Sequence, residues 1–102
     1  MTKDFVLRPE AERDLRNSFD WYEKQRPGLG AQFIASIQAA LDQIKVNPEL
    51  HPIIYKNLRR AVIRRFPYSV FYFVFPEKIH VLAVLHHRRN PAGLAARVKP
   101  DE

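Results

Sequence analysis

Two apolar runs in the second half of the chain constrain the fold more than any other feature: YSVFYFVF at residues 68–75 and IHVLAVLHH at residues 79–87. Both are rich in β-branched and aromatic residues, which is typical of strands. Because successive strand side chains point to opposite faces, each run places apolar side chains on both faces of its sheet, and such a sheet is covered on both sides. The alternation sets Tyr68, Val70, Tyr72 and Val74 against Phe71, Phe73 and Phe75, and Ile79, Val81, Ala83 and Leu85 against Leu82 and Val84.

Residues 9–46 can cover one of these faces, since they carry the pattern of two helices. Pro9 suits a first helical position, and the acidic Glu10 and Glu12 follow it at the positive end of the helix dipole. The break RPGLG ends this helix, and the second helix stops before Pro48. Two helices joined by so short a turn pack as an antiparallel hairpin. Their apolar stripes are Ala11, Leu15, Phe19 and Tyr22 in the first, and Phe33, Ile37, Leu41 and Ile44 in the second, widened by Ile34 and Ala40.

The remaining segments complete an α+β fold. DFVLR at residues 4–8 and LRRAVIRRF at residues 58–66 predict strands, and NPELHPIIYKN at residues 47–57 predicts a loop. The element order is β-α-α-β-β-β, with the N-terminal helical hairpin packed on one face of a mainly antiparallel sheet. We expect one domain over residues 1–91 and a polar C-terminal tail over residues 92–102, either a short helix or disordered.

One helical hairpin covers one face of a sheet, so the other face needs a second cover. The chain offers three possibilities: its own tail, a second copy of itself, or a partner. A large exposed apolar patch rimmed with charge is the usual mark of a binding site. We therefore expect the second face to be open to a partner.

The charge of the chain is unevenly distributed. Residues 1–55 hold 7 Lys and Arg against 8 Asp and Glu, whereas residues 56–102 hold 10 against 3, so the second half carries the whole excess of the net +6. This asymmetry fits an acidic partner, either nucleic acid or protein, or else a solvated basic face. The absence of cysteine excludes disulfides and thiolate chemistry. With no signal-peptide pattern or membrane-length apolar run, a cytoplasmic protein is expected.

The segment LHHRRNP at residues 85–91 brings histidines and arginines together at the end of a strand. His86 and His87 point to opposite faces, so they cannot grip one metal ion, and we expect neither a metal nor a cofactor. Either histidine could transfer protons near neutral pH, although a strand-end histidine is more often structural or solvated. In the WYEK stretch we expect Glu23 to be solvated.

Arginines flank the short apolar core of the strand at residues 58–66. Alternation places Arg59 and Arg65 on one face, and Arg60 and Arg64 on the other. With the arginines of LHHRRNP they can form a basic rim suited to carboxylates or phosphates, or they can protect a sheet edge. Metal-free RNA cleavage needs a base, an acid and a cation, and Arg65, His86 and Arg88 could supply parts of that set.

Five stretches of the chain resemble the RelE/ParE superfamily of toxins from type II toxin–antitoxin modules, and the ParE-like branch, often called plasmid stabilisation proteins, is the more similar. The resemblance runs from Phe5 to Pro91 and keeps the element order. The stretches are RPEAERDL, WYEKQRPGLG, FIASIQAAL, RRFPYSVFYFV and VLAVLHHRRNP.

The resemblance implies a small basic toxin that is neutralised by an acidic antitoxin laid across the sheet and helical hairpin. Characterised ParE-like members poison DNA gyrase by binding it, whereas RelE-like members cut mRNA on the ribosome. The chain departs from the nuclease pattern, since Ser69 stands in YSVFY where nucleases typically carry Arg, and nothing aromatic follows Phe75. We therefore expect a toxin that binds DNA gyrase rather than an enzyme. The predicted contacts with antitoxin or target are Arg59, Arg60, Arg64, Arg65, Tyr72, His86, Arg88 and Arg89.

The alternative is a RelE-like ribosome-dependent mRNA endonuclease with Arg65 and His86 as catalytic candidates. A third possibility is a protein that has lost its toxicity and still binds antitoxin.

Overall fold

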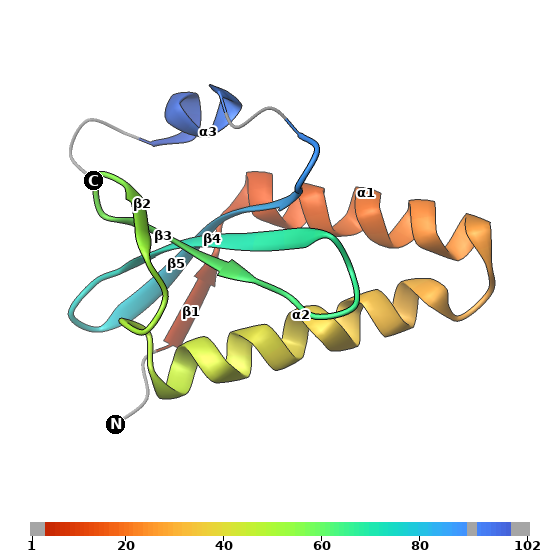
Figure 1. Cartoon of the computed structure of the whole chain (residues 1–102), viewed down its shortest axis with the longest axis horizontal. Coiled ribbons are helices and arrows are strands. Elements are labelled where there is room, and N and C mark those ends of the chain that lie inside the picture. Colours follow the sequence, from red (N-terminus) through yellow and green to blue (C-terminus); the bar gives the residue numbers. More distant parts are fainter. Residues whose placement is uncertain (1–3, 90–91, 99–102) are drawn as a thin grey trace.

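A computed structural model describes residues 4–89 and 92–98, and its centre is one five-stranded sheet of order β1-β5-β4-β3-β2 (Figure 1). β1 runs parallel to β5, and the other neighbours are antiparallel. This confirms the expected α+β fold with its helical hairpin on one face. The strands are β1 Asp4–Leu7, β2 Ile53–Tyr55, β3 Leu58–Val62, β4 Tyr68–Val74 and β5 Lys78–His86, and the helices are α1 Pro9–Gln25, α2 Leu29–Val46 and α3 Ala92–Arg97.

β2 lies inside the segment that the sequence predicts to be loop. It spans three residues, pairs with Leu58 and Arg59 of β3, and its side chains are exposed. Such a short edge strand is defined by its pairing with the neighbour, because it has no buried face to produce an apolar period.

The hairpin of α1 and α2 buries the first core against one face of the sheet. Tyr22 of α1 and Phe33 of α2 stack with ring centroids 5.2 Å apart, and both rings meet Tyr68 of β4. Val70 and Tyr72 continue this face of β4 and are fully buried. The alternation expected for β4 is therefore confirmed.

The opposite face is not left bare. Leu94 of α3 and the following Val98 belong to one buried cluster with Phe71 and Phe73, and Phe71 is 7% exposed. The expectation that this face stays open to a partner is wrong at its centre. Of the three possible covers, the chain uses residues 92–98 of its own tail.

The two faces of β5 exchange partway along the strand. Phe71 pairs with Ala83 but Tyr72 pairs with Val81, so Leu82 is an extra residue opposite the β4 register. After this bulge Val84 faces the helices, while Ala83 lies in the second core. The strict alternation predicted for β5 is therefore wrong beyond Leu82, because a bulge shifts the period by one residue.

A buried carboxylate joins α1, β5 and α3. β1 ends at Leu7, and beyond it the Val84 N–H of β5 donates to Asp14 Oδ2 (3.0 Å). Arg97 of α3 donates to both oxygens of Asp14, at 2.7 Å and 3.2 Å. These hydrogen bonds raise the pKa of Arg97 above its ordinary value, since they favour the charged guanidinium. Asp14 thus fastens the C-terminal helix to the rest of the domain.

Glu23 caps the second helix instead of being solvated as predicted. Its Oε1 accepts from the backbone N–H groups of Gly28 and Gly30, both at 2.9 Å. Gly28 precedes the helix with a φ of 90°, a left-handed conformation that favours glycine. A Cβ on Gly30 would lie 2.8 Å from the carbonyl oxygen of Phe19, so the second glycine permits close approach of the helices.

Gly30→Ala is expected to lower the free energy of unfolding by about 1–3 kcal/mol, because the added methyl group meets backbone that cannot move aside. Gly93→Ala in α3 is the control, since a Cβ there has nothing within 4 Å. The control should change stability by less than about 1 kcal/mol, in the stabilising direction. Urea denaturation of both variants measures the difference, and equal stabilities would contradict the packing argument.

Arg97→Met is expected to cost about 1.5–3 kcal/mol, because it removes charged hydrogen bonds from a buried carboxylate while keeping the apolar stem. Arg16→Met is the matched control. The Arg16–Glu12 pair is 3.5 Å long with side chains 69% and 59% exposed, and such pairs contribute at most about 1 kcal/mol. Denaturant unfolding compares the two, and equal losses would show that the Asp14 contact does not hold α3.

Candidate functional site

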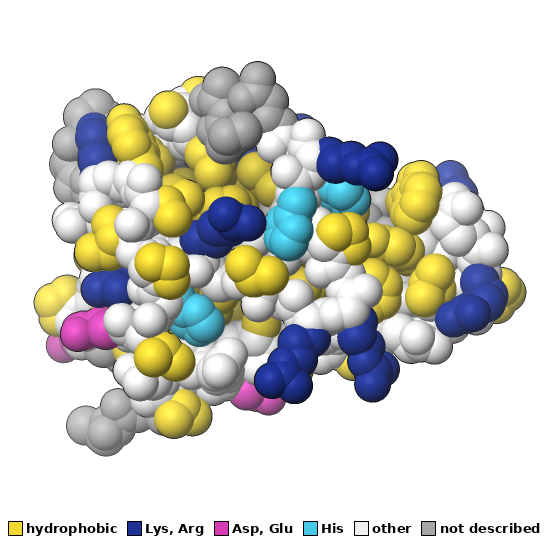
Figure 2. Space-filling view, viewed as in Figure 1, with side chains coloured by type: hydrophobic (Ala, Val, Ile, Leu, Met, Phe, Trp, Pro, Cys, Tyr) yellow, Lys and Arg dark blue, Asp and Glu magenta, His cyan; other side chains and the backbone are white. Residues whose placement is uncertain are grey.

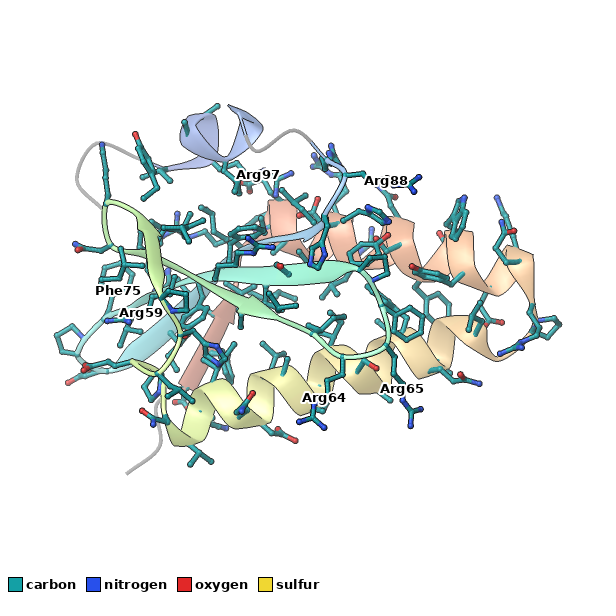
Figure 3. The ribbon with its side chains drawn as sticks, in the orientation of Figure 1. Arg59, Arg64, Arg65, Phe75, Arg88 and Arg97 are labelled. Carbon is teal, nitrogen blue, oxygen red and sulfur yellow. The ribbon has the colours of Figure 1, made fainter. Side chains whose placement is uncertain are left out.

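The predicted contact residues do not form a single rim; the structure distributes them over separate places (Figure 3). Arg59 is bound within the chain, because its Nη1 donates to the carbonyls of Glu49 (3.0 Å) and His51 (2.7 Å). Arg88 and Arg89 follow β5 and are exposed. Arg59 therefore holds the segment before β2 in place, where a surface contact was expected.

Tyr72 belongs to the core, so its prediction as a contact residue is wrong. It is 0% exposed, and its hydroxyl donates to the carbonyl of Pro48 at 2.7 Å. Burial raises its pKa to about 12. An aromatic strand residue with a satisfied hydroxyl is a structural element.

Arg64 and Arg65 border a hollow between α2 and β3, here called the α2–β3 groove. Figure 3 shows both side chains beside α2, and both are exposed. Arg65 has a φ of 72°, a left-handed conformation that costs free energy for a residue with a side chain. The groove has a volume of about 610 Å³ and is lined by Gln32, Ala35, Ser36, Ala39, Ala40, Gln43, Val62, Ile63, Arg64 and Arg65.

A second hollow, here called the Arg60 cavity, lies on the face that α3 covers, and its volume is about 420 Å³. Histidine and basic side chains gather beside hydrophobic ones on the face shown in Figure 2. Of the predicted contact residues, the cavity brings together Arg60, His86 and Arg89. The full lining is Ile54, Tyr55, Leu58, Arg60, Ser69, Phe71, Leu85, His86, His87, Arg89, Leu94 and Ala95.

A chain of hydrogen bonds forms the polar centre of the Arg60 cavity. Arg60 Nε donates to Ser69 Oγ at 3.0 Å, and His87 Nε2 lies 3.0 Å from the same oxygen. Which of Ser69 and His87 donates in the second bond depends on the tautomer of the imidazole. Ser69 is 0% exposed. The buried Ser69 thus holds the Nε side of the Arg60 guanidinium in place.

Ser69 and His87 are absent from the predicted contacts. The resemblance singles out Ser69 only as the replacement of an arginine, yet it is a small polar residue in a run whose faces are both apolar. A buried polar side chain needs partners. That rule was the available signal that Ser69 meets a donor.

His86 lies apart from the Ser69 chain. Its ring meets Tyr68 at a centroid distance of 5.1 Å, and its Nδ1 accepts from the Arg88 N–H at 2.9 Å. Arg65 lines the α2–β3 groove, whereas His86 lines the Arg60 cavity. The two groups of the nuclease alternative therefore border different hollows.

Within residues 4–89 and 92–98, no group of three or more His, Asp or Glu side chains could hold a metal ion. In the same residues, every helix is too short or too polar to cross a membrane. The arrangement found there is cationic and apolar, which suits recognition of acidic groups.

Comparisons with known proteins agree with this fold. The model of one protein family, described as "ParE toxin of type II toxin-antitoxin system, parDE", matches residues 5–91. The chain is 27% identical over 99 residues to Toxin ParE2 of Mycobacterium tuberculosis strain CDC 1551 / Oshkosh, and equally to that of strain H37Rv. The match covers 96% of this chain and 94% of the relative in both cases. A solved structure titled "Chromosomal ParDE TA system from P. aeruginosa" is similar with a TM-score of 0.67 and 18% identity, covering 83% of this chain and 96% of that one.

His51 should make the stability sensitive to acid. Burial, and then the charge of Arg59, lower its pKa from 6.5, and its buried Nε2 has no hydrogen-bond partner within the residues described. The unfolded chain therefore binds the proton first, so this contribution to stability is present above about pH 6.5 and is lost as the pH falls.

His51→Gln should remove that part of the pH dependence. Urea unfolding at about pH 7.5 and about pH 5 tests it, with the wild-type chain losing more stability on acidification than the variant. The same loss in both proteins would show that His51 is not responsible.

Proposed function

Because the chain belongs to the ParE toxin family of type II toxin–antitoxin systems, we propose that it arrests growth by binding DNA gyrase in the cytoplasm and that a cognate acidic antitoxin neutralises it. One observation carries the proposal. The α2–β3 groove and the Arg60 cavity both have arginines in their linings, and neither lining includes an Asp or Glu among the residues described. An acidic polypeptide is the partner that matches both hollows.

Exposed apolar side chains on the outer strands favour a protein partner over a partner that is bound through charge alone. Ile53, Ile54 and Tyr55 of β2 are 50%, 45% and 43% exposed, and Val62 of β3 is 57% exposed. Val62 lines the groove, while Ile54 and Tyr55 line the cavity, so apolar residues accompany the arginines in both places. Apolar anchors beside charged residues are typical of protein–protein interfaces.

The outer edge of β3 offers backbone groups as well. The register with β4 and the bond from Ile63 N to the Tyr68 carbonyl direct the backbone of Val62 away from β4. β2 pairs only with Leu58 and Arg59, so in the described part of the chain no strand lies beside Val62. An extended antitoxin segment that crosses this edge can therefore contact groove, edge and cavity in one passage.

Action by binding is also favoured over RNA cleavage. Arg65 and His86 border different hollows, and the hydroxyl of Ser69 is engaged by Arg60 and His87. A base and a cation that act on one phosphate have to reach the same reacting atoms.

Induced expression without antitoxin should therefore poison gyrase. We expect DNA-damage signals and broken or relaxed plasmid while protein synthesis continues at first. Purified protein should inhibit supercoiling by purified gyrase.

Arg64→Glu with Arg65→Glu should weaken binding to the antitoxin by at least about tenfold, because two cations become anions facing an acidic partner. Arg16→Glu on α1 is the control, and its binding should stay within about twofold of wild type.

Two outcomes would contradict this function. Prompt arrest of translation with cut mRNA, lost in His86→Ala, would establish the endonuclease alternative. Normal growth on expression of the intact protein, together with retained binding of the antitoxin, would show that it binds antitoxin without being toxic.

A further inference from the structure

We propose that the Arg60 cavity is a subsite for one acidic side chain, Asp or Glu, of a polypeptide in which an aliphatic residue is the sequence neighbour of that acid. The inference rests on the proposed function in one respect, since the acidic polypeptide it commits to is the antitoxin. It adds where a carboxylate of that partner binds and what must stand beside it.

The cation of the cavity is partly buried and already oriented. Arg60 is half-buried on β3, and its Nε is occupied by Ser69 Oγ at 3.0 Å. In the described part of the chain, no carboxylate lies in salt-bridge range of its guanidinium, unlike Arg97, which Asp14 engages. A guanidinium fixed through Nε presents its remaining N–H groups as a planar fork, and a carboxylate matches that fork with two parallel hydrogen bonds.

The neighbours of Arg60 hold it without neutralising it. Ser69 is a neutral acceptor for Arg60, and the same oxygen lies 3.0 Å from His87 Nε2. Arg89 borders the same cavity and is exposed, adding a second positive charge at the rim. The chain of hydrogen bonds therefore lowers the cost of ordering the arginine when an anion binds, and leaves the full charge available to that anion.

The other walls of the cavity are apolar, and this selects among anions. Leu58, Phe71, Leu85 and Leu94 are between 0% and 7% exposed and face the hollow from β3, β4, β5 and α3. An aliphatic side chain buries its surface against such walls, whereas a ribose–phosphate gains little there. An acid next to an aliphatic residue thus satisfies both parts of the site.

The α2–β3 groove lacks this construction. Arg64 and Arg65 are exposed, and the structure shows no side-chain hydrogen bond that fixes either guanidinium within the described residues. The groove can attract negative charge, but it does not place a cation in one orientation beside buried apolar walls. The groove therefore lacks the fixed cation that the subsite requires.

NMR titration of the full chain with three N-acetylated tripeptides tests the proposal. Two of the peptides end in an amide, and one ends in a free carboxylate. Ac-Leu-Glu-Leu-NH2 carries a side-chain carboxylate, Ac-Leu-Gln-Leu-NH2 carries none, and Ac-Leu-Gln-Leu-OH carries only a terminal one. We expect the first to shift resonances of Leu58, Phe71, Leu85 and Leu94 and to bind at least about tenfold more tightly than the second and third. Arg60→Gln should remove this preference, and Arg16→Gln on α1, which lines neither hollow, should keep it.

Several results would overturn the subsite. Equal binding of the Glu and Gln peptides, or shifts outside the cavity, would show that no carboxylate is recognised there. Equal binding of the peptide with a free terminus would assign the site to a chain end. Tighter binding of a short oligouridylate at the same residues would assign it to nucleic acid.

The test does not depend on one variant folding. If Arg60→Gln loses its native spectrum, Arg89→Gln at the exposed rim takes its place. Its affinity for the Glu peptide should fall by at least about threefold. The comparison of the three peptides on the wild-type chain needs no variant. The titrations contain neither gyrase nor antitoxin. If the peptides show no preference for a carboxylate, the subsite is excluded but the growth-arrest experiment still tests the proposed function. If expression causes no growth arrest, the preference of the cavity for a carboxylate can still be measured.

Discussion

The buried carboxylate of Asp14 is the contact on which the arrangement of both sheet faces depends. β1 is too short to follow β5 to its end, so the backbone of β5 beyond Val81 needs another partner on that side. Asp14 accepts a hydrogen bond from the Val84 N–H. Both of its carboxylate oxygens also accept from Arg97, which reaches them from the opposite face of the sheet. One side chain of α1 therefore satisfies the strand edge and fixes the helix that closes the second core.

This closure converts an apolar face into a defined cavity. Without α3, Phe71 and Leu85 would be parts of an open surface that any apolar partner could cover. With Leu94 packed over them, the hollow that remains is bounded on one side by apolar side chains and on the other by Arg60, Ser69 and His87. The C-terminal helix thus restricts what the second face can bind, and it does so through a charge pair that is itself largely removed from solvent.

The sequence predicts much of the fold because its strongest patterns are repeated. The helical stripes and the alternation of β4 each rest on several side chains, and their elements form where the periods place them. Single-residue features could not be predicted in this way. The bulge at Leu82 reverses the faces of β5 without any local sequence signal. Glu23 has the sequence context of an exposed acid, and its hydrogen bonds to Gly28 and Gly30 exist only because the turn between the helices folds back toward it.

The candidate site was harder to predict because residue type does not reveal how a side chain is used. Alternation along the strand correctly places Arg59 and Arg60 on opposite faces. It cannot predict that Arg59 binds carbonyls of the preceding loop, or that Arg60 binds the hydroxyl of Ser69. Tyr72 combined an aromatic ring with a strand position near cations, and only the carbonyl of Pro48 shows that its hydroxyl is satisfied inside the core. Partners distant in sequence decide these roles.

The positive charge of the second half therefore divides into three uses with different consequences. Arg59 and Arg97 are bound to groups of the chain itself and contribute to stability. The exposed Arg64, Arg65, Arg88 and Arg89 set the field that an approaching acidic partner meets, which mainly affects the association rate and its dependence on salt. Arg60 is held in one orientation beside apolar walls, and a cation of this kind discriminates between partners by geometry. A basic surface that draws in many acidic chains can thus retain the one whose carboxylate and aliphatic neighbour fit together.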